Sequence, residues 1–148
     1  IRRGNTLSRP VALDVAATQP AIFSTADGKP IVVNASATGP APILVNDGPA
    51  GSGDVLVLYT SGLGLTTPFI ADGVVSPSSP VATTKDPVSV TVGGVPAQVL
   101  FAGLVPGFAA FYQINITVPS GLPAGDQLPL LLSVSGQTSP PVLMKVRH

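Results

Sequence analysis

The chain has 148 residues, of which 45% are hydrophobic and only 9% charged, and its formal net charge is zero. Zero net charge gives no electrostatic basis for binding nucleic acid, and the lack of cysteine excludes disulfides and thiolate metal sites. Glutamate is absent, whereas 17 prolines and 16 glycines favour turns over helices. This composition predicts an all-β protein.

Residues 1–18 are expected to form an N-terminal extension that contains one strand. We define the N-terminal segment as residues 8–15, because their apolar side chains alternate as in a β-strand. An apolar pair follows shortly afterwards and could anchor the connector. The predicted assembly interface consists of the apolar residues of this region: Val11, Leu13, Val15, Ile22 and Phe23.

Two short apolar runs, residues 31–34 and 43–46, are expected to be short strands. Residues 54–61 are apolar at nearly every position, which predicts a buried central strand. The bend Gly62–Gly64 ends this strand. Residues 66–85 then form a long connection rich in Pro, Ser and Thr, and loops of this length are usually functional or wrap the domain.

Residues 88–118 show the clearest strand pattern in the chain. Valines alternate with polar residues in 88–92, and Gly93-Gly94 suits a two-residue hairpin turn. The return strand places Val95, Ala97, Val99 and Phe101 on one face. After a turn at Pro106-Gly107, a third strand has a strict period of two. Its inward residues are expected to be Tyr112, Ile114, Ile116 and Val118.

Two further strands are expected over residues 128–134 and 141–146. Together these elements amount to about seven or eight strands, spaced as in a β-sandwich that spans residues 19–148. No charged residue occurs between Pro87 and Gly125. Proline and glycine interrupt that stretch and its apolar residues alternate, so we do not expect a membrane span.

The two ends of the chain share a pattern. Residues 8–15 (SRPVALDV) and 139–146 (SPPVLMKV) both follow S-x-P-V-x-(Leu/Met)-x-V. Either two β-strands merely look alike, or the first has the character of a terminal strand that completes another module or subunit. Charge placement fits the second interpretation, since the two ends carry five cations while residues 10–144 carry two lysines and seven aspartates, 2 − 7 = −5.

The sequence contains no recognisable catalytic motif. Its single histidine, His148, is the last residue, and a catalytic triad needs an imidazole held in place. Asp27, Asp47 and Asp72 each precede glycine, as is typical of tight turns, and no run of aspartates resembles a calcium loop. We therefore predict a non-enzymatic protein without a cofactor or metal.

Some polar and aromatic residues admit two interpretations. Asn34 and Asn115 each begin an N-glycosylation sequon, but could equally be ordinary paired polar residues. Aromatic residues at strand spacing are either core residues or a platform on which sugars stack. The residues in question are Tyr59, Phe101, Phe111 and Tyr112.

From residue 19 onward the chain resembles a domain that recurs at the C-terminus of secreted proteins of Solibacter-type Acidobacteria. Its V-G-G-x-x-A hairpin and G-L-G bend are also similar to IPT/TIG immunoglobulin-like domains. The resemblance implies an immunoglobulin-like sandwich and a secreted, extracellular or cell-surface location, and it implies no activity. The stretches that carry it are QPAIF (19–23), VLYTSGLGLTTP (57–68), VTVGGVPAQVLFAGLVPGF (90–108), YQINITVPSGLPAGD (112–126) and VSGQTSPPV (134–142).

Two functions are compatible with these observations. In the first, the protein is a structural subunit whose N-terminal segment adds as a strand to the next copy, giving a head-to-tail filament or surface array. In the second, it is a binding module of a larger secreted protein that recognises a glycan or protein through its loops.

Overall fold

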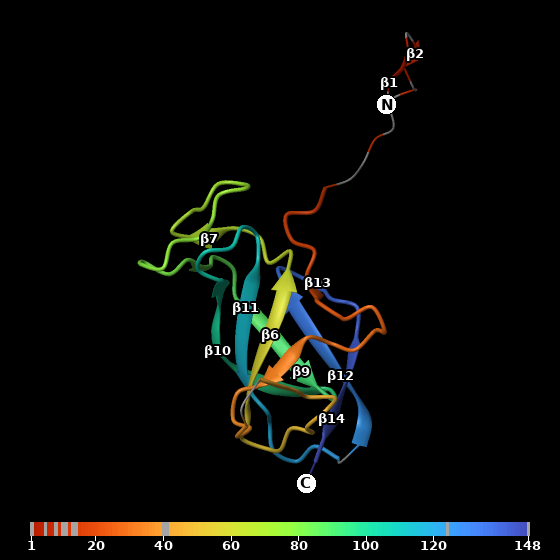
Figure 1. Ribbon diagram of the computed structural model, residues 1–148, viewed down its shortest axis with the longest axis vertical. Coiled ribbons are helices and arrows are strands. Elements are labelled where there is room, and N and C mark those ends of the chain that lie inside the picture. The colour runs from red at the N-terminus through yellow and green to blue at the C-terminus, as the bar shows by residue number, and fades with distance from the viewer. Residues whose placement is uncertain are drawn as a thin grey trace.

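The structure, a computed structural model, describes residues 2–4, 6–7, 9, 12, 15–39, 42–123 and 125–147. Throughout these residues the regular secondary structure is β-strand, and no described helix could cross a membrane. Twelve strands join into one curled antiparallel sheet whose two layers form an immunoglobulin-like β-sandwich (Figure 1). The all-β class expected from composition, and the sandwich expected from strand spacing, are thus confirmed.

The first layer is organised around two long neighbouring strands, β6 (Val55–Ser61) and β11 (Tyr112–Thr117), which pair in antiparallel register. On the other side β6 pairs with both β3 and β4. The predicted central strand is therefore found, but only one of its faces is buried; Val57 and Tyr59 face outward and are half-buried. The shorter strands of this layer are β3 (Ala21–Ile22), β4 (Val32–Asn34), β5 (Ile43–Leu44), β7 (Thr66–Thr67) and β8 (Thr83–Thr84).

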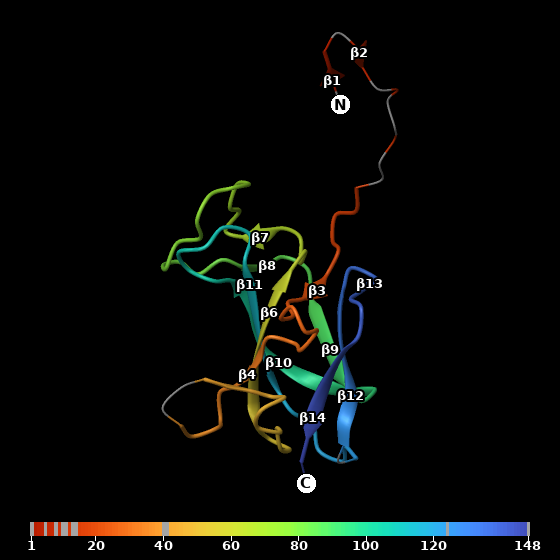
Figure 2. The ribbon, with the colours of Figure 1, turned by 45° about the vertical axis from the view of Figure 1, so that its right-hand side comes forward.

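The second layer consists of β9 (Val88–Val92), β12 (Gly125–Val134) and a return strand in two pieces. These pieces are β13 (Gln137–Thr138) and β14 (Val142–Val146), which both pair with β12. The Pro140-Pro141 pair separates them, because proline has no N–H to contribute to a ladder. Among the described strands β14 pairs with β12 alone, so it is an edge strand of this layer (Figure 2).

The two layers are joined by β10 (Val95–Leu104), which pairs first with β9 and then with β11. The register shifts between Val99 and Phe101, where one extra residue makes a β-bulge. The bulge reverses the alternation, so Phe101 lies opposite Asn115 on the outer face. The prediction that Phe101 shares a face with Val99 is wrong for this reason.

The core lies between the layers and comes from the strands with the clearest alternation. All four inward residues predicted for residues 112–118 are buried, as are Leu130, Leu132 and Val134 of β12. The largest fully buried side chains also include Leu56, Leu58, Leu63 and Met144.

Candidate functional site

The N-terminal segment, the first predicted site, is only partly described. Val11 and Leu13 lie outside the described residues, and the described positions Arg9, Ala12 and Val15 are in no strand. At these three positions the predicted strand is absent. The side chain of Val15 is 92% exposed, so this apolar residue has no cover from its own sandwich.

The chain joins the sandwich at Thr18, whose buried hydroxyl donates to the carbonyl of Val134 at 3.4 Å. Two predicted interface residues follow, and their side chains face in different directions. Ile22 is buried in β3 beside β6, whereas Phe23 turns outward and contacts the ring of Phe111. The three predicted interface residues that the structure describes, Val15, Ile22 and Phe23, therefore do not form one surface.

Four of the predicted turn residues, Gly93, Gly94, Pro106 and Gly107, lie in turns, whereas Gly62 and Gly64 directly follow the end of β6 with positive φ. Val92 pairs with Val95 across Gly93-Gly94, where both glycines have positive φ. The φ of Gly107, after Pro106, is also positive. At the bend Gly62–Gly64 a side chain is impossible at the first glycine, because a Cβ atom there would overlap the backbone carbonyl of Gln19.

A groove follows the outer edge of β14 and separates it from the edge of the first layer. It consists of two hollows, of about 470 and 360 Å³, which both reach Leu143 and Gly28. Ile22 lines the smaller hollow, while Asp47 and Lys145 line the larger one. We call these two hollows together the β14 groove.

Beside this groove the outward direction of the β14 backbone groups can be deduced from their bonds. Lys145 and Arg147 direct theirs away from β12, because the Lys145 carbonyl accepts from Ala50 and the Arg147 amide donates to Ala50. Alternation along a strand then directs the N–H and C=O of Leu143 outward too. Its partner in β12 is Pro129, which lacks an N–H and whose carbonyl accepts from Gly93 on the opposite side. Leu143, with its side chain 45% exposed, therefore marks an open stretch of sheet edge.

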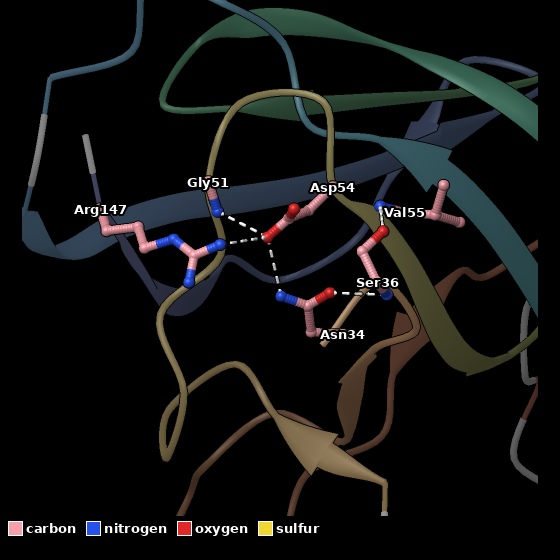
Figure 3. A network of polar contacts seen from close by, with 6 residues as sticks. All are labelled: Asn34, Ser36, Gly51, Asp54, Val55 and Arg147. Atoms are coloured by element: carbon pink, nitrogen blue, oxygen red, sulfur yellow. Dashed lines mark hydrogen bonds and ion pairs between the residues drawn. The ribbon is translucent and has the colours of Figure 1, made fainter. Parts of the chain in front are cut away.

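The other end of β14 is held by a polar network around Asp54 (Figure 3). Oδ2 of Asp54 accepts from the Gly51 amide at 2.8 Å and from Nδ2 of Asn34 at 2.9 Å, and lies 3.3 Å from Nη2 of Arg147. Partial burial acts to raise the pKa of Asp54, but the two hydrogen bonds and the Arg147 charge outweigh it, so the pKa is lowered.

Asn34 extends this network to the start of β6. Its Oδ1 accepts from the Ser36 amide at 3.0 Å, and the Ser36 hydroxyl accepts from the Val55 amide at 2.8 Å (Figure 3). Because Asn34 is buried and both ends of its side chain are bonded, the first sequon is a structural element in the folded chain. Asn115, of the second sequon, accepts from Nε2 of Gln113 at 2.8 Å.

Aromatic rings gather on the outer face of the first layer. Phe111 is at their centre, stacked on Tyr59 with ring centroids 5.2 Å apart and contacting Phe23 and Phe108 at 5.5 Å each. Phe108 is 56% exposed and the others are partly exposed. We call these four residues the aromatic cluster.

Of the four aromatic residues left open between core and platform, two lie in this exposed cluster. Tyr59 and Phe111 belong to the aromatic cluster, whereas Tyr112 points into the core and its hydroxyl donates to the Gly64 carbonyl. Burial, with a smaller contribution from Asp72, raises the pKa of Tyr112. Phe101 also lies on the outer face, but its ring contacts no ring of the aromatic cluster.

Sequence reasoning missed the β14 groove and two members of the aromatic cluster. A signal for the groove was present, since Val142, Leu143 and Met144 are successive apolar residues and one of them must face away from the core. Phe23 and Phe108 gave no such signal, because both lie outside the long alternating strands.

Within the described part of the chain, no three His, Cys, Asp or Glu side chains lie close enough to hold a metal ion. Comparisons of the chain with family models, with curated proteins and with solved structures found no match. The interpretation of the β14 groove and the aromatic cluster therefore depends on their own geometry.

Proposed function

We propose that this protein is a non-catalytic structural subunit that assembles with copies of itself by strand addition through its N-terminal segment. The observation that carries the proposal is an exposed apolar residue, Val15, at the end of the N-terminal segment of a chain whose sandwich has an open edge. Val15 is almost fully exposed, and on the side of Leu143 that faces away from β12 no strand of the described residues pairs with β14. An exposed edge readily pairs with an extended segment of another chain.

The surface chemistry of the body supports the same proposal. The chain carries few charges, and large apolar side chains such as Phe69, Val75 and Leu65 are more than half exposed. Contiguous exposed apolar surface is typical of proteins that have an interaction partner. The extracellular or cell-surface location implied by the family resemblance is part of this proposal.

Truncation tests the proposal directly. We expect the full chain to form polymers in light scattering and negative-stain microscopy, and the chain without residues 1–16 to be a folded monomer. Deletion of residues 1–7 alone is the matched control and should leave polymers intact, since it keeps the N-terminal segment. Polymers that persist without residues 1–16, or a full chain that remains monomeric, would contradict the proposal.

The aromatic cluster favours a second candidate function, a module that binds a neutral glycan. Sugars stack on exposed aromatic faces and their hydroxyl groups bond to amide side chains. Gln113 lies opposite Tyr59 on the same face, and Asn115 is bonded to it, so amide groups adjoin the cluster.

Affinity electrophoresis in gels that contain neutral polysaccharides tests this second candidate. We expect retardation of the wild type and its loss in Phe111→Ala and Tyr59→Ala variants. Phe69→Ala is the matched control, because Phe69 is exposed but lies outside the cluster. Equal mobility of all four proteins in every polysaccharide would contradict glycan binding by the aromatic cluster.

A further inference from the structure

We propose that the β14 groove is the acceptor site for the N-terminal segment of a second copy of this chain. This inference rests on the proposed function, because it names the surface to which the assembling segment binds.

The backbone of the groove can receive a strand. The amide and carbonyl of Leu143 point away from β12, and pairing can begin only after Pro141, because proline offers no N–H. At the other end the edge is already occupied, where Ala50 bonds to Lys145 and Arg147. The open stretch is therefore short, and the groove beside it has room for the side chains of an added strand.

The side chains of the segment match those of the strand that it would join. In β14 the residues facing the core are Val142, Met144 and Val146. The shared pattern S-x-P-V-x-(Leu/Met)-x-V aligns them with Val11, Leu13 and Val15. A strand paired with β14 places its alternate residues on the same two faces, so the apolar residues of the segment that lie beside the open stretch would enter the space between the layers near Ile22.

The last residue of the segment, Val15, makes no use of its own sandwich for cover, which favours contact with another copy. The chain leaves the sandwich at Thr18, which is fixed against Val134, and Val15 is already in solvent three residues earlier. Each copy therefore offers a segment whose described residues, Arg9, Ala12 and Val15, are exposed, and one open groove. Because these are different surfaces, the contact is head-to-tail and repeats into a filament unless the rotation closes.

Charge supports this pairing of surfaces. Residues 1–9 contain three arginines and no acid, whereas residues 10–148 contain four cations and seven aspartates, 4 − 7 = −3. Within the groove Asp27 already pairs with Lys29, but Asp47 makes no ion pair among the described residues. A basic end approaching an acidic body is favoured, and this attraction weakens in high salt.

Disulfide trapping tests the site, because the chain has no cysteine of its own. Ala12 and Leu143 occupy the positions that alternate with the inward residues, so they would lie on the same outer face of an extended sheet. We expect a mixture of an Ala12→Cys protein and a Leu143→Cys or Lys145→Cys protein to give a covalent heterodimer under mild oxidation. Val75→Cys, on an exposed loop, is the matched control and should give none.

A backbone variant provides the second measurement. Leu143→Pro removes the outward N–H without breaking a bond to β12, and should abolish polymers while the variant unfolds at a temperature close to that of the wild type. Leu143→Ala keeps the N–H and should still polymerise. If the wild type polymerises, Leu143→Pro also polymerises and no heterodimer forms at 143 or 145, the acceptor site is wrong while assembly stands. A wild type that never polymerises would overturn both.

Discussion

The two halves of β14 differ in how their outer edge is used. Beside Lys145 the edge is closed, because Ala50 bonds to the backbone on both sides of Val146 and the Asp54 network holds Arg147 next to it. Beside Leu143 the edge is open and borders the β14 groove. The strand itself is continuous across both halves. A neighbouring loop therefore decides which part of this edge can accept a partner.

The largest effect on stability is expected in the open half of β14, between a side chain that faces the core and one that faces solvent. Met144 is fully buried, and Met144→Ala should lower the free energy of unfolding by about 2–5 kcal/mol through lost burial and a cavity. Leu143→Ala, one position away, should change it by less than about 0.5 kcal/mol, because this side chain is half in solvent. Urea denaturation of monomeric protein lacking residues 1–16 measures both, and equal effects would contradict the assigned faces.

Removing Asp54 should weaken the closed half alone. In Asp54→Ala the backbone amide of Gly51 and the side-chain amide of Asn34 lose their acceptor. This loss should lower the free energy of unfolding by about 1–3 kcal/mol. Hydrogen exchange at the Arg147 amide should become faster, while the open half should not change. Asp47→Ala is the matched control, since its side chain is exposed and makes no ion pair among the described residues. Unchanged hydrogen exchange at the Arg147 amide would show that the Asp54 network does not hold this end of β14 against Ala50.

Acid should weaken the same half of the strand. The pKa of Asp54 is lower in the folded chain than in the unfolded chain, so its stabilisation is fully present above the unfolded value of about 3.9. It is lost as the pH falls through the folded pKa. The difference in unfolding free energy between wild type and Asp54→Ala should therefore be constant above about pH 5 and shrink below pH 4. A difference that stays constant down to pH 2 would show that the Asp54 charge is not responsible.

The parts of the fold that sequence could predict are those where alternation alone decides the outcome. β11 is the clearest case: Ile114 and Ile116 recur every second residue and the outward positions are polar, so the prediction of which residues face the core is confirmed. In β10 the same reasoning failed at Phe101, because a bulge changes the phase of the alternation and nothing in the local sequence marks it.

The candidate site was harder to predict because it is made of contacts between distant segments. The β14 groove depends on where Asp27 and Ile22 lie relative to Leu143, more than 100 residues later in the chain. The aromatic cluster likewise draws its rings from separate segments. Periodicity assigns a face to a residue, but it does not say which loops approach that face.

The smallest effect is expected for the ion pair at the closed half. The Arg147 side chain is 60% exposed and that of Asp54 only 16% exposed, so Arg147→Ala should lower the free energy of unfolding by at most about 1 kcal/mol, and less in high salt. Lys29→Ala is the matched control, because the Lys29–Asp27 pair is exposed on both sides and its loss should not be measurable. A loss for Arg147→Ala as large as that for Asp54→Ala would mean that the guanidinium, and not the two amide hydrogen bonds, closes this end of β14.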